Sequence, residues 1–575
     1  MPEQIDLAEY LFRRLYEAGA RSVHGVPGDY NLVALDYIVP AGLDWAGNCN
    51  ELNAGYAADG YGRVKGISAL VTTFGVGELS AINAIACAYT EMSPVVHIVG
   101  TPDRKLQAQG AKLHHSLCNG EAADYRAFAD MAVKITVAQE NLTDINQATM
   151  QIDSAIRTCV LYSRPVYIQL PTDMVTAKVA TSSLLQPLNL ARDPNDEETQ
   201  AAAVEEILSK IYQAKQAFIL VDGGASRYGI SQSVNALVKA TGFPTATTPY
   251  GKGIVNETLS NFHGVYSPVG KHVYVDWVKS CDLVLNFGPH GGNVNTYFFT
   301  TQMDPKVTIA FHQNTILVAR ANESPREYSL HAEGVLKGVL ARLDSAKIPK
   351  FSSNPNLPDP RKASALLPTP KGEDKLSQDI FWTRISRIFQ PGDIVLTETG
   401  TASVGGREFI LPENATLINS SIWLSIGFIL GAAQGAALAL RDLALSKGRT
   451  ILFEGDGSLQ MTVQEFSTII RKRLDMIVFV INNNGYTIER LIHGRKAHYN
   501  DIAQWRYLET ASYFGAPVND VSYPVKAVQV TTWKELDQVL STDEFKAGKG
   551  FTLVELIMEP EDACDTLQAI YNGHS

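Results

Sequence analysis

Residues 449–489 read RTILFEGDGSLQMTVQEFSTIIRKRLDMIVFVINNNGYTIE, and this stretch decides the fold. Two apolar runs, TILF and MIVFVI, are separated by a helix-length segment, LQMTVQEFSTIIRKR. Continuous apolar strands joined by a helix are typical of a parallel sheet that is covered on both faces. The stretch therefore predicts two neighbouring parallel strands with a crossover helix between them.

Polar residues follow each of these two strands. The turn Gly455-Asp456-Gly457-Ser458 follows the first strand, and Asn482-Asn483-Asn484-Gly485 follows the second. Glycine lets the backbone approach a phosphate closely, and the N-terminus of the following helix offers unpaired N–H groups. A carboxylate oxygen and neutral carbonyl oxygens are ligands that Mg²⁺ accepts. The pattern predicts a diphosphate held through Mg²⁺ by Asp456, Asn483 and the carbonyl of Gly485.

The same alternation of apolar strands and helices continues through nearly the whole chain. Further strand-like runs are SALVTTFG, PVVHIVG, RPVYIQLP, AFILVDGG, DLVLNFG, VTIAFH, DIVLTETG and FTLVELI. With 575 residues and roughly 100 to 200 residues per domain, we expect about three domains. The predicted fold class is α/β, with three doubly wound domains and mostly parallel sheets.

Two interruptions of the alternation predict the domain boundaries. The segment IPKFSSNPNLPDPRKASALLPTPKGED is rich in proline and poor in large apolar residues, which is typical of an extended linker. A weaker interruption occurs in LLQPLNLARDPNDEETQ. We expect an N-terminal domain at residues 1–185, a middle domain at 195–347, a linker at 348–375 and a C-terminal domain at 376–575.

The composition excludes several classes of protein. Apolar residues make up 45% and charged residues 19% of the chain, as in soluble globular proteins. The net charge is −11, without a block of like charges, so no basic surface for nucleic acid or an anionic membrane is indicated. The six cysteines form no C-x-x-C pair, and the longest apolar stretch, residues 427–440, is too short to span a bilayer. We expect a cytoplasmic protein with neither nucleic acid nor a membrane as partner.

Further motifs, taken together, resemble one known family. They are GVPGDYNL around Asp29, CNELNAGYAADGYGR around Glu51, TTFGVGELSA, the pair His114-His115, and GYTIERLIHG around Glu489. In this order, and with the G-D-G turn followed by N-N, they resemble the thiamine diphosphate-dependent 2-oxo acid decarboxylases. The resemblance covers essentially the full length and is strongest to the fungal pyruvate decarboxylase branch of that family. It implies that the first of the three domains binds the aminopyrimidine of the cofactor and the third binds its diphosphate, with a middle domain between them.

The resemblance implies roles for these polar residues. Glu51 corresponds to the carboxylic acid beside the aminopyrimidine ring, where burial helps it to share a proton with the ring. Asp29, His114, His115 and Glu489 match the acid–base residues of the family's active site, which move protons during the reaction.

Cofactor and substrate contacts are also implied by the resemblance. Ile426 matches the bulky side chain that bends the cofactor, and Leu424 stands where many decarboxylases have glycine. The implied cofactor-binding residues are Glu51, Thr401, Leu424, Ser425, Ile426, Asp456, Gly457, Ser458 and Asn483. The implied substrate pocket comprises Asp29, His115, Thr399, Ser403, Ile488, Glu489 and Ile492, with Val294 as a further candidate in place of an aromatic residue.

The reaction that the resemblance implies is non-oxidative decarboxylation of pyruvate to acetaldehyde and CO2, with thiamine diphosphate and Mg²⁺, through an ylid and an enamine of the cofactor. Phenylpyruvate, indolepyruvate and branched-chain 2-oxo acids are the alternative substrates, because a smaller residue at Val294 leaves room for them. More distant alternatives are a carboligase and a non-catalytic structural protein on this fold. The family also implies a homodimer with shared active sites, which usually pairs into a tetramer.

Overall fold

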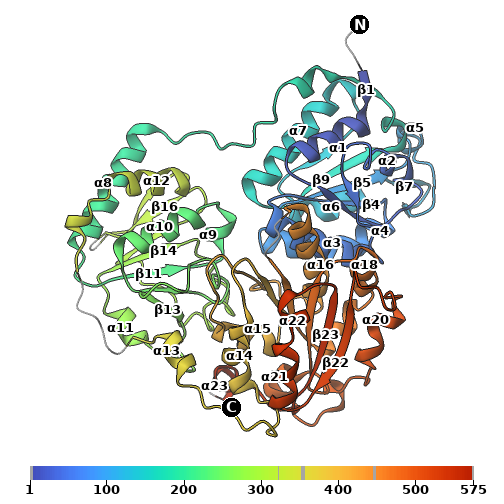
Figure 1. Cartoon of the computed structure of the whole chain (residues 1–575). Helices are drawn as coiled ribbons and strands as arrows, with labels where there is room; N and C mark the ends of the chain where they lie inside the picture. Colours follow the sequence, from blue (N-terminus) through green and yellow to red (C-terminus); the bar gives the residue numbers. More distant parts are fainter. Residues whose placement is uncertain (1–3, 321–322, 351–356, 445–447, 573–575) are drawn as a thin grey trace.

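The computed structural model describes residues 4–320, 323–350, 357–444 and 448–572. Figure 1 shows three units around a common centre: the N-terminal unit at the upper right, the middle unit at the left and the C-terminal unit below. Each unit has its own large sheet, which confirms the predicted α/β class with three mostly parallel sheets. The predicted domain limits stay predictions, and residues 351–356 of the predicted linker lie outside the described residues.

The N-terminal unit is built on a parallel six-stranded sheet in the order β3-β2-β4-β5-β9-β8. These strands are β2 (Ser22–Gly25), β3 (Asp44–Trp45), β4 (Ser68–Thr73), β5 (Val95–Thr101), β8 (Gln139–Asn141) and β9 (Val166–Pro171). Two small antiparallel pairs accompany them, namely β1 (Gln4–Asp6) with β10 (Lys178–Ala180), and β6 (Leu117–Asn119) with β7 (Ala122–Asp124). The helices are α1 (Leu7–Glu17), α2 (Leu32–Leu35), α3 (Glu51–Lys65), α4 (Val76–Thr90), α5 (Arg104–Ala108), α6 (Ala127–Ala132) and α7 (Ile145–Tyr162).

The C-terminal unit repeats this plan, with a parallel six-stranded sheet in the order β19-β18-β20-β21-β23-β22. Its strands are β18 (Ile394–Thr397), β19 (Thr416–Ile418), β20 (Thr450–Gly455), β21 (Met476–Asn482), β22 (Val525–Val530) and β23 (Phe551–Ile557). Its helices are α14 (Gln378–Ile385), α15 (Thr401–Gly405), α16 (Phe428–Asp442), α17 (Asp456–Thr462), α18 (Glu465–Arg471), α19 (Thr487–Ile492), α20 (Thr510–Tyr513), α21 (Trp533–Ser541), α22 (Asp543–Ala547) and α23 (Asp565–Asn572). Numbered along the chain, the strands of both sheets follow the order 2-1-3-4-6-5.

The middle unit has a seven-stranded sheet in the order β13-β12-β11-β14-β15-β16-β17, in which only the last two pairings are antiparallel. Its strands are β11 (Ala217–Val221), β12 (Thr245–Thr247), β13 (Phe262–Val265), β14 (Leu283–Phe287), β15 (Thr308–Phe311), β16 (Ile316–Val318) and β17 (Arg326–Tyr328). Its helices are α8 (Glu197–Gln213), α9 (Gly224–Arg227), α10 (Ser231–Thr241), α11 (Val275–Lys279) and α12 (Ala332–Arg342), and α13 (Pro360–Ala365) follows toward the C-terminal unit.

The predicted crossover helix between the strands TILF and MIVFVI is interrupted in the structure. β20 and β21 pair in parallel as predicted, but two short helices, α17 and α18, occupy the segment between them. The break has a tertiary cause. The Thr462 hydroxyl donates to Gly427 O (2.7 Å), and Thr462 O accepts from Asn53 of the N-terminal unit (3.4 Å), so the end of α17 is held by groups outside the helix.

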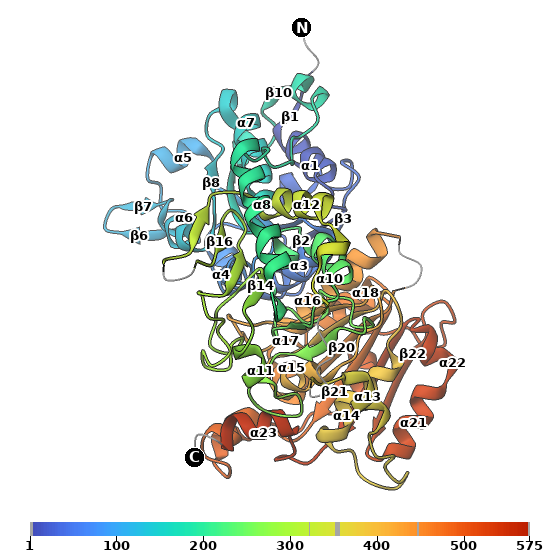
Figure 2. The ribbon, with the colours of Figure 1, turned by 90° about the vertical axis from the view of Figure 1, so that its left-hand side faces the viewer.

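Helices α3 and α16 join the N-terminal and C-terminal units, and they lie side by side in both views (Figure 1 and Figure 2). Small residues permit the approach. A Cβ at Gly60 would lie 2.1 Å from Ala432 O, and a Cβ at Gly435 would lie 1.9 Å from Ala57 O. Both helices are largely buried, so this contact fixes the relative position of the two similar sheets.

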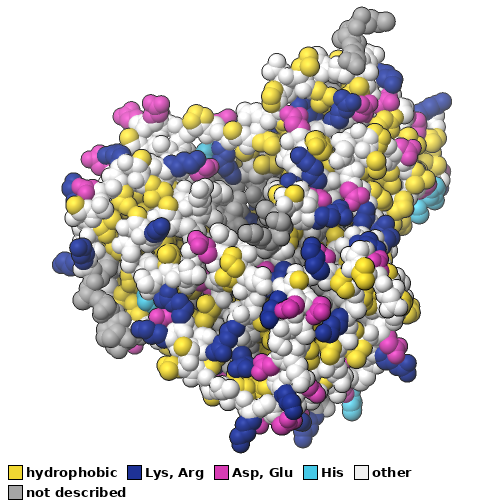
Figure 3. Space-filling model, in the orientation of Figure 1, with side chains coloured by type: hydrophobic (Ala, Val, Ile, Leu, Met, Phe, Trp, Pro, Cys, Tyr) yellow, Lys and Arg dark blue, Asp and Glu magenta, His cyan; other side chains and the backbone are white. Residues whose placement is uncertain are grey.

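The surface carries both signs of charge. On the face in Figure 3, Lys and Arg side chains are interspersed with Asp and Glu side chains over all three units. Within the described residues, no helix combines the length and apolar character needed to cross a bilayer.

Candidate active site

A cavity of about 670 Å³ lies at the carboxyl ends of β18, β20 and β21 in the C-terminal unit. Ligands of open α/β sheets bind at this edge. Most of the predicted C-terminal site residues line the cavity, namely Thr399, Thr401, Ser403, Leu424, Ile426, Asp456, Gly457, Ser458, Asn483, Gly485, Ile488, Glu489 and Ile492. Val294 joins them from the middle unit.

Oxygen atoms converge at one end of this cavity. Asp456 is 1% exposed, and its carboxylate accepts from the backbone N–H groups of Gly457 (2.8 Å) and Gly485 (3.2 Å). One terminal atom of the Asn483 amide lies 3.0 Å from Gly485 O and 3.2 Å from Asp456 Oδ1, and the other lies 2.7 Å from Thr487 Oγ1. Burial raises the pKa of Asp456 to about 6. The three predicted metal ligands are therefore neighbours.

The amide of Asn483 has two possible orientations. With its nitrogen toward Gly485 O and Asp456 Oδ1, it donates to both atoms. With its oxygen there, three oxygens face one another and the nitrogen donates to Thr487 Oγ1, which itself donates to Pro560 O (2.9 Å). The second orientation places three acceptor oxygens side by side, an arrangement that a bound cation would stabilise.

Glu398, which the sequence reasoning missed, organises the wall of the cavity. One carboxylate oxygen accepts from Gly427 N (3.1 Å) and Ile429 N (3.0 Å) at the N-terminus of α16, where a negative charge is favourable. The other accepts from Thr399 N (2.6 Å). Glu454 lies beside it at the next strand end, and burial raises the pKa values of both carboxyls. The sequence feature that could have identified Glu398 is its position directly after an apolar strand.

The loop that carries Leu424 and Ile426 is held by the N-terminal unit of the same chain. Glu91 Oε1 accepts from the backbone N–H of Ser421, Ile422 and Trp423 at 2.8–2.9 Å. Leu424 has a φ of +53°, in the left-handed region that favours glycine.

Ser425 has a different environment from its neighbours Leu424 and Ile426. It is absent from the cavity lining among the described residues, and its hydroxyl instead lies 2.7 Å from Tyr56 OH and accepts from Asn83 Nδ2 (3.0 Å).

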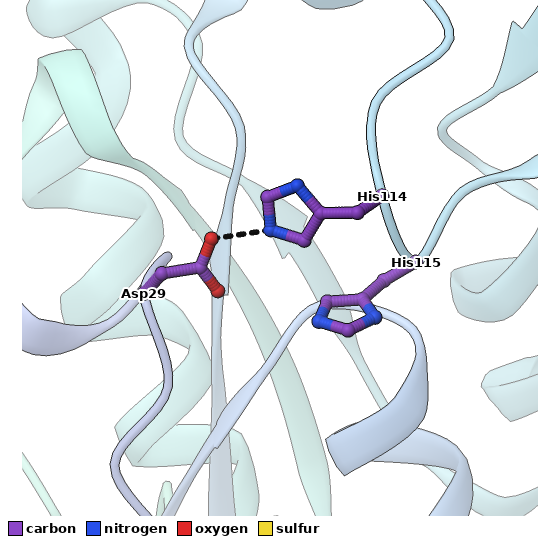
Figure 4. A group of neighbouring side chains, drawn as sticks. All are labelled: Asp29, His114 and His115. Atoms are coloured by element: carbon purple, nitrogen blue, oxygen red, sulfur yellow. Dashed lines mark hydrogen bonds and ion pairs between the residues drawn. The ribbon is translucent and has the colours of Figure 1, made fainter.

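Asp29, His114 and His115 form a separate cluster on the N-terminal unit, shown in Figure 4. His114 Nε2 lies 2.5 Å from Asp29 Oδ2, and the ring of His114 stacks on Tyr30 with centroids 5.0 Å apart. The side chains of His114 and Asp29 are 57% and 48% exposed. The cluster therefore presents titratable groups to the surface of this chain, where they can exchange protons with a bound molecule or a second protein surface.

Glu51 begins α3 on the same unit. Its Oε1 atom faces the start of α4, where a Cβ at Gly77 would lie only 2.9 Å away. Burial raises the pKa of Glu51 above its ordinary value, so the side chain is more easily protonated than a surface glutamate.

The structure thus divides the predicted site residues into two groups. Within the described residues, the cavity lining contains Glu489 but does not contain Glu51 or the cluster of Asp29, His114 and His115. The cavity also has walls that the sequence reasoning missed, formed by Arg407, Met461, Tyr486, His493, Tyr499, Asn500 and Tyr571. Tyr486 and His493 had a signal in the sequence, because both belong to the motif GYTIERLIHG.

Comparisons with known proteins agree with this three-unit arrangement. Residues 5–120 match the N-terminal TPP binding domain of thiamine pyrophosphate enzymes, residues 204–325 match their central domain, and residues 398–556 match their C-terminal TPP binding domain. The chain is 46% identical to a pyruvate decarboxylase of Aspergillus parasiticus over 99% of this chain and 98% of that protein. It is 47% identical to one of Aspergillus fumigatus (98% and 96% covered) and 39% identical to pyruvate decarboxylase isozyme 3 of Saccharomyces cerevisiae (98% and 97% covered). The chain belongs to the thiamine pyrophosphate enzyme family.

Proposed function

We propose that this chain catalyses the non-oxidative decarboxylation of a 2-oxo acid, pyruvate to acetaldehyde and CO2, with thiamine diphosphate and Mg²⁺. Its relatives named pyruvate decarboxylase match it over nearly their full length. The observation that carries the proposal is the cavity, in which phosphate-compatible glycine turns, converging oxygens and Glu489 lie together.

The residues at the end of the cavity fit Mg²⁺. Ligands that sit about 2.1 Å from an octahedral ion lie about 3.0 Å from one another. The Asn483 amide atom is 3.0 Å from Gly485 O and 3.2 Å from Asp456 Oδ1, which agrees with that spacing. Asp456 supplies the charge from a buried carboxylate that accepts hydrogen bonds from the backbone N–H groups of Gly457 and Gly485. We assign Asp456, Asn483 and Gly485 to the metal.

The cofactor supplies a carbon nucleophile and an electron-accepting ring when it is bound. The chain's residues then have distinct tasks. The turn at residues 455–458 and Thr401 bind the diphosphate end, while Ile426 and Leu424 shape the middle of the cavity. Ser425 acts indirectly, because its bonds to Tyr56 and Asn83 fix the backbone on which both neighbours lie.

Proton transfer belongs to the carboxyl and imidazole groups. Glu489 lies inside the cavity, and Asp29 and the two histidines form the exposed cluster of the N-terminal unit. Glu51, whose pKa burial raises, is suited to hold a proton beside the aminopyrimidine ring. Thr399, Ser403, Ile488 and Ile492 line the space left for the side chain of the acid.

The division of these groups supports a homodimer with shared sites. One chain places its cavity and its acid–base cluster apart, so a complete site requires the N-terminal unit of one subunit and the C-terminal unit of another. Two-fold symmetry then forms two identical sites per dimer. Pairing of two dimers into a tetramer is part of the same proposal, and light scattering of the purified protein measures it.

Mixed dimers test both the residues and the sharing. Glu51→Gln and Asp456→Ala variants, each inactive alone, are produced separately and then co-expressed in equal amounts. If sites are shared, co-expression restores about a quarter of the wild-type activity, since half of randomly paired dimers are mixed and each keeps one intact site. No recovery, with mixed dimers demonstrated by two affinity tags, would contradict sharing.

A larger 2-oxo acid is the second candidate substrate, and one observation favours it. Val294, a side chain of modest size, forms part of the cavity wall. Comparing kcat/KM for pyruvate, 2-oxoisovalerate, phenylpyruvate and indolepyruvate decides between the candidates. A clear preference for pyruvate supports the first, and a preference for an aromatic or branched acid supports the second. Inactivity on all four despite bound cofactor would instead favour a carboligase or a non-catalytic protein.

A further inference from the structure

One loop of the middle unit forms part of the cavity in the C-terminal unit. Residues 290–297, which we call the wall loop, follow β14 and carry Val294. Among the described residues, Val294 is the sole middle-unit side chain that lines the cavity. Its position therefore depends on what holds the wall loop in place.

A buried carboxylate holds this loop. Asp222 directly follows β11 and is 3% exposed. It accepts from His290 N at 2.7 Å and from Asn295 Nδ2 at 2.9 and 3.0 Å, so both partners belong to the wall loop. Charged acceptors make stronger hydrogen bonds than neutral ones. Asp222 thus fixes the loop on both sides of Val294.

The remaining bonds of this network tie the loop to the middle sheet. Asp222 also accepts from Thr248 Oγ1 (2.6 Å), which follows β12. Asn295, itself 1% exposed, accepts from Tyr250 N (2.9 Å) and donates to His290 O (2.7 Å). Every polar group of the Asn295 side chain is therefore engaged, and the loop has one well-defined geometry.

The wall loop leads into a strained stretch of backbone. Tyr297, Phe298 and Phe299 have φ values of 47°, 55° and 67°, three consecutive side-chain-bearing residues in the left-handed region. L-residues avoid this region, and such strain persists only where the surroundings impose it, commonly at functional sites. Arg407, which lines the cavity, lies 4.9 Å above the Tyr297 ring.

The loop also contacts the segment that leads to the cofactor end of the cavity. A Cβ at Gly292 would lie 2.9 Å from Ile422 Cγ1, two residues before Leu424. A movement of the wall loop away from this contact would carry Val294 with it and widen the cavity, and the Asp222 network opposes that movement from the middle sheet.

We propose that Asp222 is a positioning residue that sets which 2-oxo acids the cavity accepts, because it holds Val294 in the wall. The inference rests on the proposed function. It assigns substrate size selection to a buried acid of the middle unit whose side-chain hydrogen bonds, within the described residues, all come from that same unit.

The test is the Asp222→Asn variant, measured with pyruvate and with phenylpyruvate. Asparagine keeps the shape but turns one acceptor into a donor, which faces the Asn295 Nδ2 donor whichever oxygen it replaces. The ratio of kcat/KM for phenylpyruvate to that for pyruvate should rise about five- to tenfold, within the range that a hydrophobic wall supplies. The Val294→Ala background should abolish this rise, because Asp222 acts through Val294.

Two further variants separate positioning from general damage. Glu257→Gln also replaces a buried carboxylate of the middle unit, one that pairs with Lys252 at 2.6 Å and accepts from Leu411 N at 3.0 Å, and none of these bonds involves the wall loop. It should leave the substrate ratio unchanged. If Asp222→Asn does not fold, Asn295→Ser releases the loop from the other side and should shift the ratio in the same direction.

The outcomes distinguish this inference from the proposed function. An active wild type, with an unchanged ratio in folded, cofactor-loaded Asp222→Asn and Asn295→Ser variants, would overturn the inference alone. A shift of equal size in the Val294→Ala background would also overturn it. A wild type that decarboxylates none of the 2-oxo acids would overturn the proposed function first.

Discussion

The N-terminal and C-terminal units share one strand order but present different chemistry at corresponding places. Asp29 lies four residues after Gly25, the end of β2, and Thr401 lies four residues after Thr397, the end of β18. The helices α3 and α16 also correspond, since each lies between the second and third strands of its unit. Glu51 begins the first helix, and the segment of Ile426 precedes the second.

The polar groups of the two units differ in how far they are buried. In the C-terminal unit the acids at the strand ends, Glu398, Glu454 and Asp456, are at most 1% exposed. In the N-terminal unit Asp29 and His114 are about half exposed. Buried carboxylates bonded to backbone N–H groups are suited to hold a cation or a loop, whereas exposed groups are suited to exchange protons. Under the proposed function, the same frame serves as a binding half in the C-terminal unit and as a proton-transfer half in the N-terminal unit, and the dimer brings the two together.

The largest loss of activity should come from a substitution in the binding half. Asp456→Ala removes the only charged side chain among the three proposed metal ligands, so under the proposed function Mg²⁺ and the diphosphate lose their anchor. We expect loss of retained thiamine diphosphate and a fall in kcat/KM of about a thousandfold or more. Denaturing the purified variant and assaying released cofactor measures the first effect. Asp537→Asn, an exposed carboxylate of the same unit, is the control; normal cofactor retention by Asp456→Ala would refute the assignment.

The next largest effect is on stability, at the contact between α3 and α16 that joins the two halves. A Cβ at Gly435 would lie 1.9 Å from Ala57 O, and a backbone atom cannot move aside as a side chain can. Gly435→Ala should lower the free energy of unfolding by about 3 kcal/mol, at the upper end for overpacked sites. Urea denaturation measures it.

Gly334→Ala in α12 is the matched control, because its nearest neighbours are the ends of the Gln200 and Asn195 side chains. It should be neutral or slightly stabilising, since alanine is the better helix former. Equal stability of both variants would show that the α3–α16 contact is looser than described.

The strands and the residue types of the site could be predicted, because both depend on local pattern. Apolar runs such as MIVFVI and the turn at residues 455–458 carry their own signals. Other features depend on distant contacts. The break after α17 arises from bonds of Thr462 to Asn53 and Gly427, and the anchoring role of Asp222 arises from Asn295. No local pattern encodes such pairs, so they become visible only in the folded chain.

A third prediction compares two buried glutamates, one in each half. Burial raises the pKa of both Glu78 and Glu465 to about 7, from an ordinary value of 4.5. Between pH 4.5 and 7 the folded chain then binds more protons than the unfolded chain, so stability falls as the pH rises through this window. At pH 8 both carboxylates are charged and destabilise the fold.

Their partners differ, so their amide variants should differ as well. Glu78 accepts from Gly75 N and Tyr167 OH, whereas Glu465 accepts from Asn48 through one oxygen and its other oxygen has no partner in the described chain. Glu465→Gln should raise the free energy of unfolding by about 2 kcal/mol at pH 8 and leave it unchanged at pH 4. Glu78→Gln should raise the free energy of unfolding at pH 8 by a smaller amount. Urea denaturation midpoints at the two pH values measure both effects. A stabilisation by Glu465→Gln that does not depend on pH would contradict the raised pKa of Glu465.

The smallest expected effect concerns Leu424, a cavity-lining residue whose backbone is in the left-handed region. Leu424 has a φ of +53°, which costs a leucine about 1 to 2 kcal/mol, while glycine adopts it freely. Leu424→Gly relieves this strain but adds freedom to the unfolded chain, so the free energy of unfolding should rise by less than about 1 kcal/mol. Ser420 Oγ, which accepts from Leu424 N at 2.9 Å, keeps the backbone in place in the variant. The leucine side chain lines the cavity, so its removal should also raise KM more than it lowers kcat. A strong loss of stability would mean that the side chain, rather than the backbone, holds this segment against the cavity.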